Sequence, residues 1–258
     1  MKPRRIRLRE QLVLHLAEEI IAGRLAVGET FPAEPELART FGISKVVLRE
    51  AIQELASHGL LRVQHGKHTK VLEQSFWNVL AQPVQAGYRQ SGAASDLTEQ
   101  LYDVRLILEL SAVSLATEHR SRDDLRELDA LVESMRAIAK TTRDVSTFLV
   151  SDRAFHDVIG RATGNMVLRA MMRDLHNLLA ANWDGSHTLP AQLEFLAEQH
   201  AAIAESIRGR DDRTAIARMK AHLQSAKKIE TAQTDEVGQR PLSRPEARRR
   251  RNNRQSRG

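Results

Sequence analysis

The sequence of 258 residues contains no cysteine. Disulfide bonds and thiolate chemistry are therefore excluded, and a reducing compartment such as the cytoplasm is expected. Aromatic residues make up only 4% of the chain, whereas Leu, Ala, Glu and Arg fill long stretches, a composition that favours helices. There is no run of about 18 apolar residues, so no membrane span is expected, and the basic N-terminus lacks the apolar segment of a signal peptide.

The formal net charge of +6 is distributed unevenly. Residues 240–258 hold eight arginines and one glutamate, residues 1–75 carry a net positive charge, and residues 76–239 a net negative one. A basic N-terminal part on a mildly acidic body suggests that the N-terminal part binds a polyanion. The stretch 231–258 is polar, Arg-rich and nearly free of apolar residues, so we expect it to be disordered.

Residues 1–73 show the pattern of a winged helix-turn-helix. The helical spacing of LREQLVLHLAEEIIAGRL is followed by a short segment, PAEPELARTFG, and a longer one, ISKVVLREAIQELASHG, in which Ser44 is the expected N-cap. Two strand-like runs, 60–63 and 69–72, then flank a turn at Gly66. Three helices and a hairpin predict a DNA-binding head with a small β-hairpin wing.

The rest of the chain is expected to be helical. Residues 74–95 read as a linker around a short helix that is interrupted at Pro83, and Asp96 and Glu99 resemble a capping-box start. The expected helices run roughly over 97–118, 122–140, 144–163, 166–184, 190–208 and 212–230. We therefore expect a mostly α protein with a winged helix-turn-helix head (1–73), a linker (74–95), an antiparallel all-α bundle (96–230) and a disordered tail (231–258).

The second helix of a helix-turn-helix reads base edges with its N-terminal residues. The expected DNA contacts are Ser44, Lys45, Val46 and Arg49 of SKVVLRE and His65, Gly66 and Lys67 of the wing tip. The i,i+4 spacing places Lys45 and Arg49 on one face. Either cation could instead be solvated and paired with a residue such as Glu50, and His65 could simply be exposed. The whole pattern favours double-stranded operator DNA as the partner.

Three histidines and one aspartate in the bundle lie at the edges of apolar helix faces. Asp152 and His156 are one turn apart in SDRAFHDVIG, His200 lies in EFLAEQHAAIAESI, and His222 lies in ARMKAHLQSAKK. Such groups facing a bundle interior suit a divalent ion, namely Zn²⁺ with Ni²⁺ or Mn²⁺ as alternatives. The same spacing also fits an ordinary acid–imidazole pair and half-buried histidines, so it leaves both interpretations open.

The segment PAEPELARTFGISKVVLREAIQELASHGLL resembles the signature of the GntR family of bacterial repressors, and QHGKHTKV looks like the wing of its FadR-type members. The resemblance implies that Lys45, Arg49, His65 and Gly66 contact DNA. Two departures suggest a different affinity or site preference. Pro35 stands where the family usually has Arg, and Lys45 replaces a common Arg and cannot form the same bidentate fork.

The region 96–228 resembles the FCD effector domain of this subfamily, through LYDVRLILE (101–109) and the segments around 152–165, 200–209 and 219–223. In metal-binding members the ligands are one Asp and three His, which fall here on Asp152, His156, His200 and His222. The resemblance also implies that the metal holds the carboxylate of a small organic acid, assisted by Arg105.

These features predict a cytoplasmic, homodimeric transcription regulator, most simply a repressor, that responds to a small carboxylate such as a sugar acid or hydroxy acid. Dimerisation is expected because one winged head reads only a few base pairs. One alternative is a metal-dependent hydrolase domain fused to a DNA-binding head, but no separate general base stands at a fixed spacing, so we expect no enzyme. The other is an architectural DNA-binding protein that acts through its Arg-rich tail.

Overall fold

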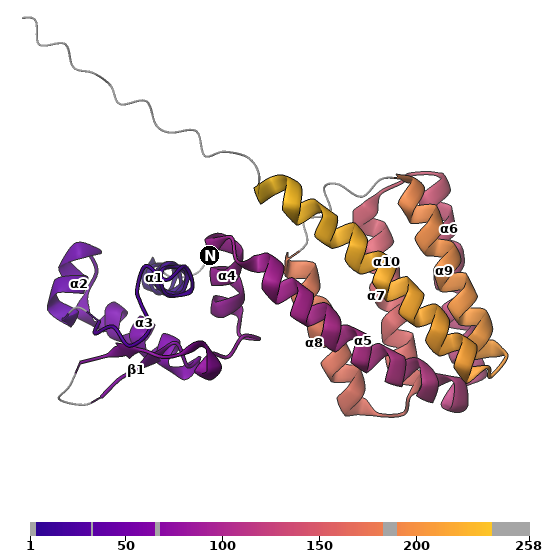
Figure 1. Ribbon diagram of the computed structural model, residues 1–258, viewed down its shortest axis with the longest axis horizontal. Coiled ribbons are helices and arrows are strands. Elements are labelled where there is room, and N and C mark those ends of the chain that lie inside the picture. Colours follow the sequence, from indigo (N-terminus) through magenta and orange to yellow (C-terminus); the bar gives the residue numbers. More distant parts are fainter. Residues whose placement is uncertain (1–3, 32, 65–67, 183–189, 239–258) are drawn as a thin grey trace, which may run out of the picture.

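The computed structural model describes residues 4–31, 33–64, 68–182 and 190–238. In chain order its elements are α1 (Arg4–Ile21), α2 (Glu34–Thr40), α3 (Lys45–Ser57), β1 (Leu61–Arg62), β2 (Lys70–Val71), the 3₁₀ helix η1 (Gln74–Phe76), α4 (Gln82–Ser91), α5 (Ala94–His119), α6 (Arg122–Lys140), α7 (Val145–Ala162), α8 (Met166–Asn182), α9 (Pro190–Arg208) and α10 (Asp212–Gly238). Figure 1 shows a head with α1–α3 beside a helical bundle, with α4 between them. This mostly α architecture confirms the expected fold class.

The head packs α1, α2 and α3 into one core and closes it with the hairpin. Ser44 begins α3, and its hydroxyl accepts a hydrogen bond from the Val47 backbone N–H at 3.3 Å, as the sequence predicted. The strands β1 and β2 pair in antiparallel fashion, with Leu61 opposite Val71. Both of these residues are buried in the core, so the hairpin is fixed against the helices at its base.

The segment predicted to be a linker contains α4, and Pro83 starts this helix rather than interrupting it. Proline is favoured in the first turn because an N–H there would have no intrahelical acceptor. Helix α4 lies so close to α1 that a Cβ at Gly87 would sit 2.5 Å from Ile21 Cδ1 and 3.2 Å from the Ala17 backbone. Gly92, with φ of 80°, ends α4 in the left-handed region and lets the chain turn into α5.

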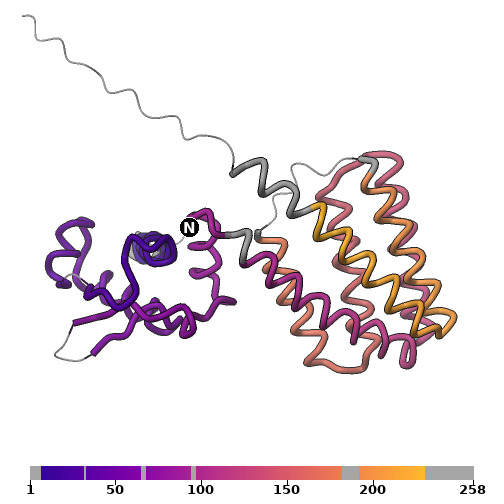
Figure 2. Tube along the Cα trace, viewed as in Figure 1, coloured from indigo at the N-terminus to yellow at the C-terminus, as the bar shows by residue number. Residues whose placement is uncertain are grey.

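The core of the head continues into the bundle. Leu101 and Tyr102 of α5 and Leu175 and Leu179 of α8 are buried in the same apolar cluster as the inner residues of the head and of α4. We call these four side chains the junction residues. Figure 2 shows that the N-terminal half of α5 and the C-terminal half of α8 are the parts of these helices nearer the head. The two helices are therefore anchored in both cores.

Helices α5–α10 enclose a second core. Helix α5 contacts α7, α8 and α10, while α6 contacts α7 and α9, and α9 contacts α10. Phe148, Phe155 and Ile159 of α7 are almost fully buried in this core. Helix α7 thus presents its inner side chains to the neighbouring helices. Among the described residues, no helix is long and apolar enough to cross a membrane.

The predicted helix limits agree with the structure in some places and differ in others. Helices α6 and α9 run over the predicted 122–140 and 190–208. Helix α5 begins at Ala94 without a side-chain cap, so the capping-box start predicted at Asp96 is wrong. Helix α10 extends to Gly238, past its predicted end at 230, while 239–258 lie outside the described residues.

Candidate functional site

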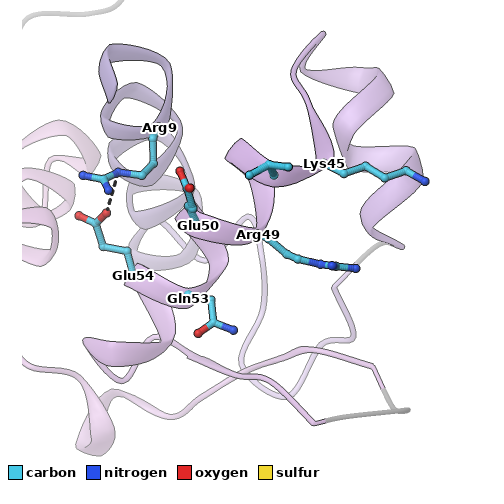
Figure 3. Close-up of a pocket in the computed structure, with 7 residues that line it drawn as sticks. Arg9, Lys45, Arg49, Glu50, Gln53 and Glu54 are labelled. Carbon is cyan, nitrogen blue, oxygen red and sulfur yellow. Dashed lines mark ion pairs between the residues drawn. The ribbon is translucent and has the colours of Figure 1, made fainter. Parts of the chain in front are cut away.

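The outer side of α3 presents the residues predicted to read DNA. Lys45, Val46 and Arg49 are exposed, and Lys45 and Arg49 extend to the same side of the helix (Figure 3). Val46 is 54% exposed beside these cations, where an apolar side chain can contact a thymine methyl group. Ser44 is exposed as well, but its hydroxyl caps α3. This arrangement fits insertion of α3 into a major groove.

Arg49 has a different ionic partner from the one considered in the sequence. Its Nε donates to Glu34 Oε2 at 3.0 Å, across the turn between α2 and α3, whereas the partner considered was Glu50. The Arg49 side chain is 70% exposed, and exposed ion pairs contribute only about 0–1 kcal/mol. A phosphate or a guanine edge can therefore displace Glu34. The predicted wing contacts His65, Gly66 and Lys67 lie outside the described residues.

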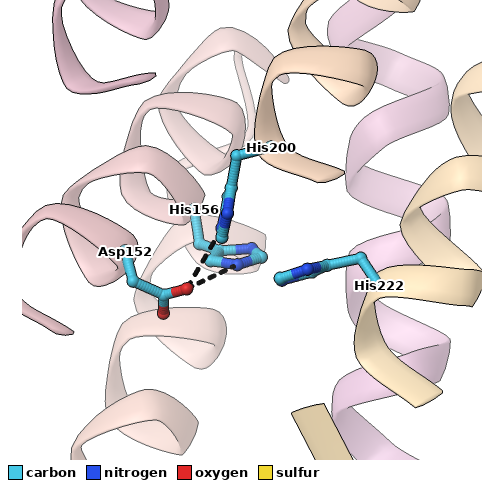
Figure 4. A group of neighbouring side chains, drawn as sticks. All are labelled: Asp152, His156, His200 and His222. Carbon is cyan, nitrogen blue, oxygen red and sulfur yellow. Dashed lines mark ion pairs between the residues drawn. The ribbon is translucent and has the colours of Figure 1, made fainter. Parts of the chain in front are cut away.

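The four predicted metal ligands converge in the core of the bundle. Asp152 and His156 come from α7, His200 from α9 and His222 from α10, and each imidazole is buried (Figure 4). One nitrogen or oxygen atom from each of the four lies within 4.8 Å of the others. Asp152 Oδ1 lies 3.1 Å from His200 Nε2 and 4.0 Å from His156 Nε2. An ion bound about 2.0–2.2 Å from each ligand separates the ligand atoms by roughly 3–4 Å, so the spacing fits one ion.

Hydrogen bonds at Nδ1, the ring nitrogen that faces away from the site, hold two of the imidazoles in the tautomer that a metal requires. His200 Nδ1 lies 2.8 Å from the Leu196 carbonyl oxygen, and His222 Nδ1 lies 3.2 Å from Gln199 Oε1. Because both oxygens only accept, each Nδ1 carries the proton and each Nε2 keeps its lone pair. His200 Nε2 and His222 Nε2 are buried without a hydrogen-bond partner. Buried polar atoms normally have partners, so these residues fit a metal ion as the missing one.

The protonation states of the four residues also suit a metal. Burial by itself would raise the pKa of Asp152, but contact with His200 and the charge of Arg105 outweigh it and hold the pKa well below its usual range. Burial lowers the pKa of His156 and that of His222, so both imidazoles are neutral near pH 7. Metal binding needs an ionised carboxylate and neutral imidazoles, and this core supplies both.

Arg105 is buried beside these residues and already has an anionic partner. Its side chain is 6% exposed, and its Nε donates to Glu109 Oε1 at 2.7 Å. The same oxygen lies 2.9 Å from His176 Nε2, and Glu109 Oε2 contacts His156 Nδ1. Glu109 and His176 were not among the residues predicted from the sequence. The i,i+4 spacing from Arg105 could have indicated Glu109, whereas no spacing in the sequence indicates His176.

Glu109, His156 and His176 are a second group whose atoms lie close enough to hold an ion. Its carboxylate is already neutralised by the guanidinium of Arg105, whose Nε donates to Glu109 Oε1 at 2.7 Å. The carboxylate of Asp152 has no arginine or lysine bonded to it among the described residues. The group around Asp152 is therefore the better candidate.

A pocket between α7 and α8 adjoins this core. Arg153, Arg169, Arg173 and His176 are among its lining residues. Arg169 is paired with Asp157, with Nη2 and Oδ2 2.6 Å apart, and Arg173 Nε lies 3.9 Å from Asp174 Oδ1. The lining itself holds three arginines and one aspartate, so its charge is positive on balance. His176 separates the pocket from the buried carboxylate that it contacts. The positive lining favours the approach of an anionic ligand.

Two family models match successive parts of the chain. The model of "Bacterial regulatory proteins, gntR family" matches residues 8–71, and the model of the FCD domain matches residues 100–225. The chain is 23% identical over 206 residues to the galactonate operon transcriptional repressor of Escherichia coli (strain K12), covering 78% of this chain and 87% of that protein. It is 27% identical over 229 residues to the HTH-type transcriptional repressor NanR of Cronobacter sakazakii (strain ATCC BAA-894), covering 86% of this chain and 84% of that protein.

A solved structure shares the fold. The structure of Lar, which controls the expression of the Listeria monocytogenes agr system, superimposes with a TM-score of 0.54 and 19% identity, covering 92% of this chain and 99% of that one. At this level of identity the likeness concerns the fold alone.

Proposed function

Because the chain belongs to the GntR family of transcription regulators and carries an FCD domain, as FadR-type members do, we propose that a small carboxylate held at a metal site in the bundle controls its DNA binding. Family membership makes the protein a regulator rather than an enzyme, with operator DNA and a small-molecule effector as its partners. The two compared relatives are repressors, and one acts on a galactonate operon. Galactonate is a sugar acid, and we extend this class of ligand and the repressor role to the present chain.

The observation that carries the proposal is the convergence of Asp152, His156, His200 and His222 on one point, with two buried Nε2 atoms that lack a hydrogen-bond partner. Three imidazoles and one carboxylate suit Zn²⁺, with Ni²⁺ or Mn²⁺ as alternatives. The ion would supply a positive charge and an open position for an anionic oxygen. The four side chains would hold it and exclude water from its inner side.

The charges around the site favour an effector with one carboxylate there. A divalent ion and Arg105 bring three positive charges, and the buried carboxylates of Asp152 and Glu109 offset two of them. One positive charge remains, which a single carboxylate neutralises. Arg105 can pair with that group because guanidinium binds carboxylates in bidentate fashion. The pocket between α7 and α8 offers such an anion a positively charged approach.

We assign operator binding to the head. The proposed contacts are Ser44, Lys45, Val46 and Arg49 of α3 and His65, Gly66 and Lys67 of the wing. One head covers only a few base pairs, so a cytoplasmic homodimer on a two-fold operator doubles the contacts. In this division residues 1–73 bind DNA, and residues 96–230 bind the effector and dimerise.

Metal analysis and a ligand screen test the proposal. Protein stripped by a chelator, reloaded with Zn²⁺ and desalted should keep one equivalent per chain. His200→Ala should keep none, whereas His119→Gln, which changes a half-exposed histidine of α5, should behave as the unsubstituted protein. In a thermal-shift screen of sugar acids and hydroxy acids, a binder should stabilise the reloaded protein by about RT ln(1 + [L]/Kd), and should lose this effect in His200→Ala. Failure of the unsubstituted protein to keep metal would refute the site.

A further inference from the structure

Glu109 is a buried carboxylate with three polar partners. Its side chain is 1% exposed, Oε1 lies 2.7 Å from Arg105 Nε and 2.9 Å from His176 Nε2, and Oε2 contacts His156 Nδ1. The partners belong to α5, α8 and α7. A carboxylate buried to this extent is unfavourable unless its partners compensate for lost hydration. Glu109 therefore either stabilises the packing of the three helices or supports the group around Asp152.

The contacts of the other ring nitrogen of His156 distinguish these two roles. His156 Nε2 lies 3.3 Å from Arg105 Nη2, and a guanidinium can only donate. Nε2 therefore accepts, and Nδ1 carries the proton and lies in contact with Glu109 Oε2. In this tautomer Nε2 keeps a lone pair, which Arg105 Nη2 contacts and which a metal ion could take in its place, 4.0 Å from Asp152 Oδ1.

The three imidazoles differ in the group that contacts Nδ1. A backbone carbonyl holds His200 and a side-chain amide oxygen holds His222, and both of these acceptors are neutral. His156 has a carboxylate instead. A carboxylate that accepts from one ring nitrogen fixes the ring and makes the other nitrogen a stronger ligand.

We propose that Glu109 is a positioning residue of the metal site, which fixes His156 with Nε2 toward the ion and holds Arg105 beside it. This inference rests on the proposed metal site around Asp152. Glu109 would bind neither the ion nor the effector itself, since its oxygens are occupied by Arg105, His156 and His176.

Glu109→Gln tests this role, because it removes the charge with little change in shape. At pH 8 the Kd for Zn²⁺, measured by competition with a chromogenic chelator, should rise about 10–100-fold. The protein should also be labelled with ¹⁵N-histidine and examined without metal. The ring ¹⁵N chemical shifts of His156 should then show a mixture of the Nδ1–H and Nε2–H tautomers in the variant, instead of the Nδ1–H tautomer alone. Glu118→Gln is the matched control, since Glu118 lies on the same helix with its side chain 74% exposed, and it should change neither quantity.

A second comparison covers the case in which Glu109→Gln does not fold. Arg105→Met/Glu109→Met replaces the whole ion pair with apolar groups, and such replacements are often tolerated. Its Kd for Zn²⁺ should exceed that of Arg105→Met by a similar 10–100-fold, because only the single variant keeps the carboxylate on His156.

The outcomes separate this inference from the function on which it rests. An unsubstituted protein that binds no Zn²⁺ overturns the metal site itself. One equivalent bound with the same Kd, and the same His156 signal, in a folded Glu109→Gln variant would show that Glu109 only packs the helices. Two equivalents in the unsubstituted protein, one of them lost in Glu109→Gln, would make Glu109 a ligand and overturn the positioning role.

Discussion

Replacing Arg105 with methionine should destabilise the metal-free protein by about 3 kcal/mol or more. Arg105 and Glu109 form an ion pair with Nε and Oε1 2.7 Å apart and side chains 6% and 1% exposed. Removing one partner of a buried pair leaves the other charge uncompensated, which costs about 3–5 kcal/mol. His156 and His176 still contact Glu109 in the variant, so the lower end of this range is expected.

The double variant Arg105→Met/Glu109→Met should recover part of this loss. Replacing both charges with apolar groups of similar volume is often neutral or stabilising, and the two imidazoles lose one acceptor each, at about 1 kcal/mol per hydrogen bond. The double-mutant cycle isolates the coupling of the pair, because the two residues are in direct contact. A positive coupling would show that Arg105 is needed for the core as well as for any ligand.

Urea denaturation followed by circular dichroism, at pH 7.5 with a chelator present, measures these differences. Arg136→Met is the matched control, because Arg136 binds Glu198 at 2.8 Å in a pair whose side chains are 32% and 62% exposed. An exposed pair contributes about 0–1 kcal/mol, so the control should lose little. A loss below 1 kcal/mol in Arg105→Met, or a double variant as unstable as the single one, would refute the reasoning.

Three other predictions concern DNA, the tail and pH. Arg49→Ala should weaken operator binding, measured by fluorescence anisotropy, by about 1–3 kcal/mol per half-site. Arg126→Ala, on the exposed face of α6, should not, and equal losses would argue against α3 as the reading helix. Deleting residues 240–258 should flatten the salt dependence of non-specific DNA binding, since each phosphate contact adds about 0.9 to the log–log slope. Operator preference should survive, and its loss in the truncated protein would give the tail a reading role. Zn²⁺ retention after desalting should persist below pH 6.5, because burial lowers the pKa of His156 and His222 and protons compete only at lower pH. Complete loss of metal already at pH 6.5 would contradict the burial argument.

The inner positions of Asp152, His156, His200 and His222 could be predicted because helical spacing relates each residue to the apolar face of its own helix. The structure brings these four together, and their role in metal binding stays a prediction. Spacing does not tell which side chains of another helix meet that face. Glu109 meets His176 across 67 residues of sequence, so this contact could not be read from either helix alone.

Two other features depended on tertiary packing in the same way. From the sequence, Pro83 could mark either an interruption or the start of a helix. In the structure it lies in the first turn of α4, which packs closely on α1 at Gly87. Arg49 was considered with a neighbour in its own helix, but the turn between α2 and α3 places Glu34 beside it. By contrast, the limits of α6 were predictable, because the capping box of Ser121 and Asp124 is a local signal.

The junction residues also determine how this protein could be rebuilt. A bundle excised from residue 96 onward would leave Leu101, Tyr102, Leu175 and Leu179 without their cover, and each buried apolar side chain loses roughly 1.5–3 kcal/mol on full exposure. Chimaeras that join a foreign head to this bundle inside 74–95 would therefore need new partners for these four side chains. Changing the outer residues of α3 alone leaves that shared core intact. For a biosensor with a new operator, the surface of one helix is the practical unit of exchange.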